Sequence, residues 1–234
     1  ARYKFTNGTG ELVDAITQDG GFDVELNTSI ASVQQSEAGV VVTSTNGEVV
    51  QAKRAVVTVP LNLLNSVSFD PPLSAAKQEA STLKHVGGGY KVFFEVEGDP
   101  GAVMTLSRST DSPLIGSFTY KRGEQHSVLA GFSLEPGALD KSVDDWQVVL
   151  EEFLPGVKLL STFGHDWGDD ALSQGSWCTY RPGTIARFAN ALPQQEGNLV
   201  FASGDHAQAW RGFIEGAIAS GSSAALGIAK SLQG

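Results

Sequence analysis

Three short stretches of this sequence hold residues whose types and spacing could support chemistry. Lys91 lies in an otherwise apolar stretch, directly before Val92-Phe93-Phe94. A lysine in a strand most often lies on a solvated face, and the alternative is a cation that stabilises charge at a reaction centre. The second stretch, 175–183, holds two aromatic residues and the single cysteine, Cys178. The third stretch, 201–221, is rich in glycine and alanine.

The third stretch predicts a ligand site at the start of a helix. An apolar strand, Leu199 to Ala202, runs into a Gly/Asp loop, and a second loop ending at Gly212 leads into a helix from about Phe213. Small residues in the first turns of this helix let another backbone or a flat ligand approach closely. A helix N-terminus also offers unpaired N–H groups and a partial positive charge. The alternative is a small-residue helix that only packs on a sheet.

The patterns around these stretches predict a mixed α/β architecture. Asn46-Gly47 is a strong hairpin turn, and the apolar run 55–60 fits a strand buried on both faces of a parallel or mixed sheet. Alternating or apolar runs predict the other strands at 24–26, 30–34, 39–44, 48–53, 90–96, 115–120, 127–132, 157–163 and 199–202. Helices are expected up to Gly20, over 75–83 and 143–153, and from Phe213 onward.

Composition excludes several classes of protein. The 234 residues carry 16 basic and 26 acidic side chains, a formal charge of -10, which argues against binding to nucleic acid or to an anionic membrane. One cysteine rules out a disulfide framework, and the four histidines lack the spacing of metal ligands, so we expect no metal. No apolar run reaches the roughly 20 residues of a membrane span. We therefore expect a soluble protein and favour the cytoplasm.

The order of these segments resembles that of the flavin-dependent amine oxidases, the family of monoamine and polyamine oxidases. The matching segments are Ala55–Pro60 with Phe69–Leu73, Gly89–Phe94, Trp167–Pro182 and Leu199–Ala225. The resemblance implies a two-domain fold in which FAD-binding segments, 1–73 and 175–234, flank a substrate domain, 74–174. It also implies that the substrate domain is built on a mixed or antiparallel sheet with helices.

The resemblance implies oxidation of a small amine to an imine, then an aldehyde or ketone, with O2 reduced to H2O2. Lys91 falls where the family has a lysine that holds a water against flavin N5, and it is the expected catalytic residue. Trp177 and Phe213 match the two aromatic positions that flank the substrate amine, where the family usually has tyrosines. No general base is assigned, because a deprotonated amine can donate hydride without one.

The resemblance implies FAD as the cofactor. The expected cofactor-binding residues are Ile30, Pro60, Trp167, Ser176, Gly204, Asp205, Gly212, Phe213, Ile214 and Ala217. Ser176 matches the cysteine that carries the flavin covalently in animal monoamine oxidases, so we expect non-covalent binding. Strand alternation would place Cys178 on the same face as Ser176, and a shift of one or two residues in the match would reverse this expectation. The favoured interpretation of Cys178 is a small buried apolar residue.

The sequence lacks one motif of the family. Flavin amine oxidases open with a strand, a Gly-x-Gly-x-x-Gly turn and a helix that hold the pyrophosphate. Gly8-Thr-Gly10 has no suitable strand before it, and Gly87-Gly-Gly89 precedes a strand instead of a helix. We therefore expect the N-terminal half of the oxidase as a partner, supplied by a second chain or a missing segment. A processed subunit and a trimmed polypeptide both fit, and the oligomeric state stays open, a homo-oligomer included.

Two alternative functions remain at this point. An L-amino-acid oxidase shares the fold and would need Arg181 or Arg211 to face the substrate carboxylate. The second alternative is a binding or regulatory module that has the flavin scaffold but no catalytic activity.

Overall fold

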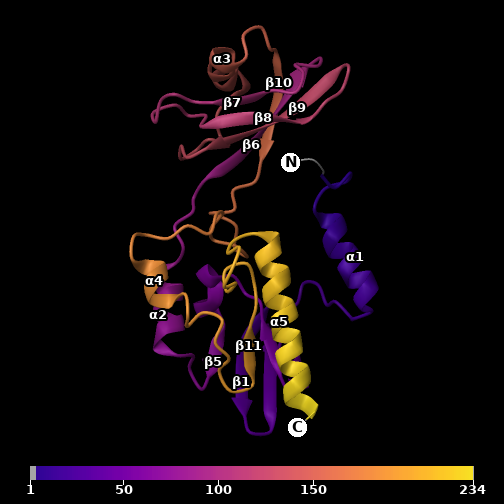
Figure 1. Ribbon diagram of the computed structural model, residues 1–234, viewed down its shortest axis with the longest axis vertical. Helices are drawn as coiled ribbons and strands as arrows, with labels where there is room; N and C mark the ends of the chain where they lie inside the picture. The colour runs from indigo at the N-terminus through magenta and orange to yellow at the C-terminus, as the bar shows by residue number, and fades with distance from the viewer. Residues whose placement is uncertain (1–3, 234) are drawn as a thin grey trace.

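An antiparallel sheet of five strands forms one end of the molecule (Figure 1). The computed structural model describes residues 4–233. The strands lie in the order β10-β6-β9-β8-β7 and span Tyr90–Glu97 (β6), Met104–Leu106 (β7), Gly116–Lys121 (β8), His126–Ser133 (β9) and Leu159–Gly164 (β10). Helix α3 (Val143–Phe153) covers one face of this sheet. The antiparallel sheet expected from the family resemblance is thereby confirmed.

Side chains along β6 alternate between the two faces of the five-stranded sheet, and one of these faces packs in the apolar core under α3. The buried positions of β6 are Val92, Phe94 and Val96. Phe94 packs edge-on against Trp146 of α3, with ring centroids 5.1 Å apart. Because successive residues of a strand point to opposite faces, Lys91 and Phe93 lie on the face away from α3. Strand β6 therefore has one face that packs in the core and one face, with Lys91 and Phe93, that does not pack against α3.

Two smaller sheets form the other part of the molecule (Figure 1). The first has the order β3-β2-β1-β5 and consists of β1 (Ile30–Ser36), β2 (Gly39–Ser44), β3 (Val49–Ala52) and β5 (Ser68–Asp70). The second pairs β4 (Ala55–Val57) with β11 (Leu199–Phe201) in parallel. The hairpin predicted around Asn46-Gly47 is confirmed as β2–β3. A shared apolar core that includes Val33, Leu64 and Leu199 holds the two sheets together.

Helices accompany these two sheets, and the N-terminal helix stands apart from them (Figure 1). They are α1 (Gly10–Gly20), the 3-10 helix η1 (Leu61–Ser66), α2 (Ala75–Leu83), α4 (Thr184–Phe188) and α5 (Ile214–Gln233). Helix α2 packs against η1 and α4 through Leu61, Ala80 and Phe188. Helix α5 runs along β11, and its N-terminal end points toward the five-stranded sheet (Figure 1). Among the described helices, none combines the length and apolar character needed to cross a membrane.

Two expectations about strands are wrong. Residues 24–26 form no strand, and Val24 and Leu26 are exposed, because apolar alternation without a neighbouring strand gives their backbone no hydrogen-bond partners. Strand β4 is confirmed as a parallel strand, but it is not buried on both faces, since Val56 is 42% exposed. The structure also contains strands β5 and β7 and helix α4, which the sequence patterns did not predict.

Two crossing segments, 84–89 and 165–183, join the two parts of the molecule. They are hydrogen-bonded to each other, since the N–H of Val86 donates to the carbonyl of Thr179 at 2.7 Å and that of Ser176 donates to Gly87 at 2.9 Å. The structure therefore brings Lys91, which follows the first segment, close to the 175–183 stretch. The domain boundaries proposed at 73/74 and 174/175 stay a prediction.

Candidate functional site

Lys91 and Trp177 line the same cavity, which has a volume of about 610 Å³. Its wall also includes Trp167 and Ser176, so four of the predicted site residues lie around one space. Phe93 and Phe163 form the part of the wall that belongs to the five-stranded sheet. The cavity therefore lies where the two crossing segments meet the sheet face opposite α3.

Trp177 is seated on glycines at the start of β6. A Cβ at Gly89 would lie 1.9 Å from Cζ3 of Trp177, and one at Gly87 would lie 1.7 Å from the Trp177 carbonyl oxygen. Ser176 fixes the same junction, because its Oγ donates to the Gly87 carbonyl at 3.1 Å. Only glycine permits this approach. The sequence pattern of the glycine run 87–89 indicates only an incomplete pyrophosphate motif, because its contact with Trp177 depends on a segment that is distant in the chain.

Lys91 is an exposed cation beside an aromatic ring. Its Nζ lies 5.9 Å from the ring centroid of Phe132, its cross-strand neighbour on β9. The Phe132 ring lies in turn 6.0 Å from that of Trp177, between centroids. The Phe132 ring thus lies between the two predicted residues, although no sequence pattern indicates this position. Its place on the Lys91 face could have been found only from the register of β6 against β9.

Cys178 lies in a different environment from Ser176. The Cys178 Sγ donates to the Tyr180 hydroxyl at 3.3 Å, and a Cβ at Gly212 would lie 2.6 Å from the Cβ of Cys178. Residues 175–183 form no strand, so the expectation that alternation puts Cys178 and Ser176 on one face is wrong. Burial raises the pKa of the Cys178 thiol to about 11. The favoured interpretation of Cys178 is a small buried apolar residue, whereas its exposure in the structure is intermediate.

A second group of predicted residues lies at the carboxyl ends of the parallel strands β4 and β11. Asp205, in the loop after β11, accepts through Oδ2 from the backbone N–H of Leu61 at 2.8 Å, directly after Pro60. The Gly212 N–H donates to the Gly204 carbonyl at 2.9 Å and closes the loop. The carboxyl ends of parallel strands are where open α/β sheets bind ligands. The hydrogen bond to Leu61 uses one oxygen of Asp205, and a carboxylate can accept several more.

The start of α5 presents apolar side chains to the outside of the described structure. Phe213 is 64% exposed and Ile214 is 50% exposed, and the Phe213 ring meets Trp210 edge-on at 6.2 Å. Ala217 follows one turn later and is also exposed. Because Cys178 touches Gly212, their sequence neighbours Trp177 and Phe213 come from adjoining segments. The pairing of these two rings around a substrate stays a prediction.

The remaining predicted residues lie away from the cavity. Ile30 is the first residue of β1, and its contact with adenine stays a prediction. Arg181 donates to the Leu83 carbonyl at 3.4 Å, and Arg211 donates to the backbone carbonyl of Asp205. Neither arginine lines the cavity beside Lys91. Within residues 4–233, no three His, Cys, Asp or Glu side chains form a group that could hold a metal ion.

His206 is the buried polar group next to this loop. Its Nδ1 lies 2.7 Å from the Ser203 hydroxyl, and its side chain is fully buried. Burial lowers the pKa of His206 to about 4, so the ring is neutral near pH 7. Among the described residues its Nε2 has no hydrogen-bond partner. The hydrogen bond between His206 and Ser203 therefore lies within the loop that contains Gly204 and Asp205.

These residues fit a flavin nucleotide. The loop at the carboxyl end of β11 supplies Gly204 and a carboxylate with spare acceptor capacity, and α5 supplies a helix N-terminus beside it. The exposed rings of Trp210 and Phe213 can cover a flat apolar ring system. A polar group for a sugar chain and an apolar surface for a ring are thus adjacent, as FAD requires.

Comparison with known proteins finds relatives along the whole chain. The family model for flavin containing amine oxidoreductases matches residues 2–229. A pseudooxynicotine dehydrogenase of a Pseudomonas species is 38% identical over 239 residues, covering 100% of this chain and 48% of that protein. The nicotine dehydrogenase of Pseudomonas putida (strain DSM 28022 / S16) is 29% identical, covering 94% of this chain and 45% of that protein.

Solved structures show the same fold. A putrescine oxidase with bound putrescine superposes with a TM-score of 0.83 at 20% identity, covering 95% of this chain and 53% of that chain. The cyclohexylamine oxidase from Brevibacterium oxydans IH-35A gives a TM-score of 0.79 at 20% identity, covering 96% and 52%. The chain spans about half the length of the relatives that it matches.

Proposed function

This chain belongs to the family of flavin containing amine oxidoreductases, whose cofactor is FAD, and we propose that it forms the substrate-facing half of an amine oxidase. A bound FAD would supply the hydride acceptor for the carbon next to the amine nitrogen, with O2 as the proposed final electron acceptor and H2O2 as its product. Hydrolysis of the resulting imine releases an aldehyde or ketone together with ammonia or the remaining amine. The observation that supports this proposal best is the single cavity that holds Lys91, Trp177 and an aromatic wall.

Each side chain of the cavity has a role in this proposal. The Trp177 ring, fixed on Gly89, forms a wall that excludes water and favours the neutral amine, whose lone pair assists loss of hydride. Phe213 is proposed to close the opposite side. Lys91 provides the ammonium group among the described residues of the wall, and this group would stabilise negative charge that develops next to it.

The cofactor is proposed to lie over the start of α5 and the loop 203–212. Asp205 accepts hydrogen bonds from the sugar chain, and the α5 N-terminus faces the electron-rich end of the ring system. Ser176 offers no thiol for attachment, and the buried, protonated thiol of Cys178 is a poor nucleophile. Binding is therefore proposed to be non-covalent.

A complementary N-terminal half is proposed to complete the site. Its existence is supported by the coverage of relatives, of which this chain matches about half. The chain also presents uncovered apolar side chains: α1 has no buried residue, and Val13, Leu26 and Ile214 are exposed. Such surfaces are typical of interfaces. The complementary half would carry the Gly-x-Gly-x-x-Gly turn, on the same polypeptide or on a second chain.

The structure favours amines over amino acids as substrates. An L-amino-acid oxidase would need an arginine that faces the carboxylate, and Arg181 and Arg211 donate to backbone carbonyls and do not line the cavity beside Lys91. The relatives are named for nicotine and pseudooxynicotine, and two are dehydrogenases, so the electron acceptor is a separate question. The experiment must therefore observe reduction and reoxidation separately.

The test mixes the flavin-loaded enzyme with amines in the absence of oxygen. We expect the visible absorbance of oxidised flavin to bleach and H2O2 to appear when O2 is admitted. Trp177→Ala should slow bleaching while leaving flavin content nearly unchanged. Bleaching without H2O2 would indicate another acceptor, and no bleaching with any amine would leave only the non-catalytic module.

A further inference from the structure

Asn62 is a buried polar residue that joins the two parts of the molecule. It lies in the 3-10 helix η1 and is 5% exposed. Its Oδ1 accepts from the backbone N–H of His85 at 2.8 Å. Its Nδ2 donates to the carbonyl of His85 at 3.2 Å and to that of Gln174 at 2.7 Å. One side chain therefore binds both crossing segments, 84–89 and 165–183.

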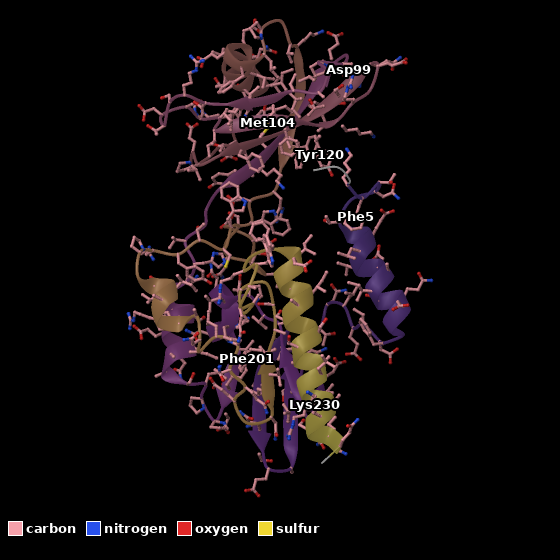
Figure 2. The ribbon with its side chains drawn as sticks, viewed as in Figure 1. Phe5, Asp99, Met104, Tyr120, Phe201 and Lys230 are labelled. Atoms are coloured by element: carbon pink, nitrogen blue, oxygen red, sulfur yellow. The ribbon has the colours of Figure 1, made fainter. Side chains whose placement is uncertain are left out.

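The same helix is also bonded to the loop that is proposed to hold the cofactor. The N–H of Leu61, the residue before Asn62, donates to Oδ2 of Asp205 at 2.8 Å. Leu61 is fully buried, so this end of η1 is fixed by close packing. Figure 2 shows the crossing between Tyr120 of the five-stranded sheet and Phe201 of β11, which leads into this loop. Two successive residues of η1 thus connect the cofactor loop to both crossing segments.

The backbone that Asn62 holds is strained in both segments. Gln174 has a φ of 51°, and Lys84, directly before His85, has a φ of 57° and a ψ of 164°. A positive φ is uncommon at a residue with a side chain, and it persists where the surrounding structure holds it. The two strained residues are also bonded to each other, since Lys84 Nζ donates to Gln174 Oε1 at 2.7 Å. Asn62 therefore stabilises a geometry that neither segment would keep by local preference alone.

The two main residues of the proposed cavity stand close to these bonds in the chain. Trp177 lies in the second segment, and Lys91 follows the first segment at the start of β6. Gly175 packs directly on the amide, because a Cβ there would lie 2.6 Å from Asn62 Nδ2. A displacement of about 1 Å in an enzyme site can slow a reaction about a hundredfold. The positions of Lys91 and Trp177 therefore depend on the bonds that Asn62 makes.

We propose that Asn62 is a positioning residue for flavin reduction, which holds Lys91 and Trp177 in place relative to the cofactor loop. This inference rests on the proposed function and adds a residue that does not line the cavity beside Lys91. Asn62 acts through the two crossing segments. Its loss should slow hydride transfer and leave the amount of bound FAD nearly unchanged, because Asp205 keeps its own bond to Leu61.

The test compares Asn62→Leu with Asn65→Leu in the complete, flavin-loaded enzyme. Asn65 lies on the same helix, and its Nδ2 donates to Gln78 at 3.1 Å and to Thr82 at 3.0 Å, so its loss loosens η1 from α2 and leaves the crossing intact. Flavin reduction is followed without oxygen, with benzylamine or putrescine, whichever bleaches the wild type faster. We expect the limiting rate to fall about tenfold in Asn62→Leu, with a smaller change in the amine Kd, and both to stay within about twofold in Asn65→Leu.

Two further variants keep the test decisive if Asn62→Leu does not fold. Asn62→Asp keeps the size of the side chain and the acceptor for the His85 N–H, and it loses both donors. We expect it to slow reduction as well. Gln174→Gly, added to either Asn62 variant, should recover part of the rate, because glycine adopts a positive φ without steric cost. No recovery would overturn the role assigned to the strained backbone.

Visible circular dichroism of the bound oxidised flavin separates failure of this inference from failure of the proposed function. The signal depends on the groups around the flavin and needs no turnover. A changed spectrum in Asn62→Leu at equal FAD content, with an unchanged spectrum in Asn65→Leu, would support the positioning role even if neither amine reduced the wild type. Wild-type rate and spectrum in Asn62→Leu, or equal losses in both leucine variants, would overturn it.

Discussion

Lys91 can be tested independently of the fold, because its side chain lies on the face that does not pack against α3. Lys91→Met keeps the length and the apolar stem and removes the ammonium. If Lys91 only faces solvent, stability should change by less than about 0.5 kcal/mol and kinetics should stay the same. If it acts at the flavin, reoxidation by O2 should slow tenfold for each roughly 1.4 kcal/mol of lost stabilisation. Stopped-flow measurement of both half-reactions, with Lys91→Arg as the charge-retaining control, distinguishes these outcomes.

Cys178 and Ser176 make a second prediction at the scale of single residues. Acid denaturation of the flavin-loaded enzyme should leave the yellow colour in the supernatant, because Ser176 cannot form a thioether and the pKa of Cys178 is raised to about 11. Colour that stays with the pellet in the wild type and is lost in Cys178→Ser would contradict the prediction and identify Cys178 as the attachment point.

Some of these residues were accessible from sequence and others were not. Lys91 and Trp177 stand in recognisable local patterns, and the structure places both on one cavity. Phe132 and Gly89 have no local signal, because their roles depend on residues that reach them only through strand register and through the return of a distant segment. Residue type and spacing report on the chain near a position, while contacts across a sheet depend on pairing.

At the scale of elements, the shape of the cavity depends on the contact between segment 175–183 and the glycines directly before β6. Gly89→Ala would put a Cβ 1.9 Å from the Trp177 ring, so the ring must move. Overpacking of this kind costs about 1–3 kcal/mol. We expect a lower melting temperature and a changed tryptophan fluorescence spectrum. Gly88→Ala is the matched control, since its Cβ would meet nothing within 4 Å, and an equal effect of both variants would show that the change acts only on backbone freedom.

The difference between local patterns and long-range contacts also explains which helices and strands could be predicted from the sequence. Helices α2 and α3 and four strands of the five-stranded sheet, β6, β8, β9 and β10, have long periodic patterns, and the structure confirms them. Residues 24–26 have the alternation of a strand but no partner, so the prediction fails there. Strands β5 and β7 have only three residues each, which is too short for a period to be visible.

At the scale of the whole molecule, the order of segments was sufficient to indicate a flavin amine oxidase fold, and the comparisons confirm it. The cavity at the crossing of segments 84–89 and 165–183 could not be predicted in the same way, because it depends on how the two parts of the molecule are joined. Segment 165–183 lines the cavity beside Lys91, and its Cys178 adjoins Gly212 of the loop after β11. A change at the crossing should therefore affect both substrate and cofactor.

The last prediction concerns FAD binding by residues 1–234 alone. These residues include Asp205 and the start of α5, which we propose contact the cofactor, but no Gly-x-Gly-x-x-Gly turn for the pyrophosphate. That turn contributes several charge-assisted hydrogen bonds, each worth about 1.5–3 kcal/mol, so their lack should weaken binding by orders of magnitude. Calorimetric titration of FAD into residues 1–234 should show weak or no binding, and addition of a complementary half with the glycine turn should restore it. Asp205→Asn is the control, because it should weaken binding in the completed enzyme and change little in the isolated chain. Sub-micromolar binding by the isolated chain would show that the α5 side of the site holds the cofactor without help from the pyrophosphate turn.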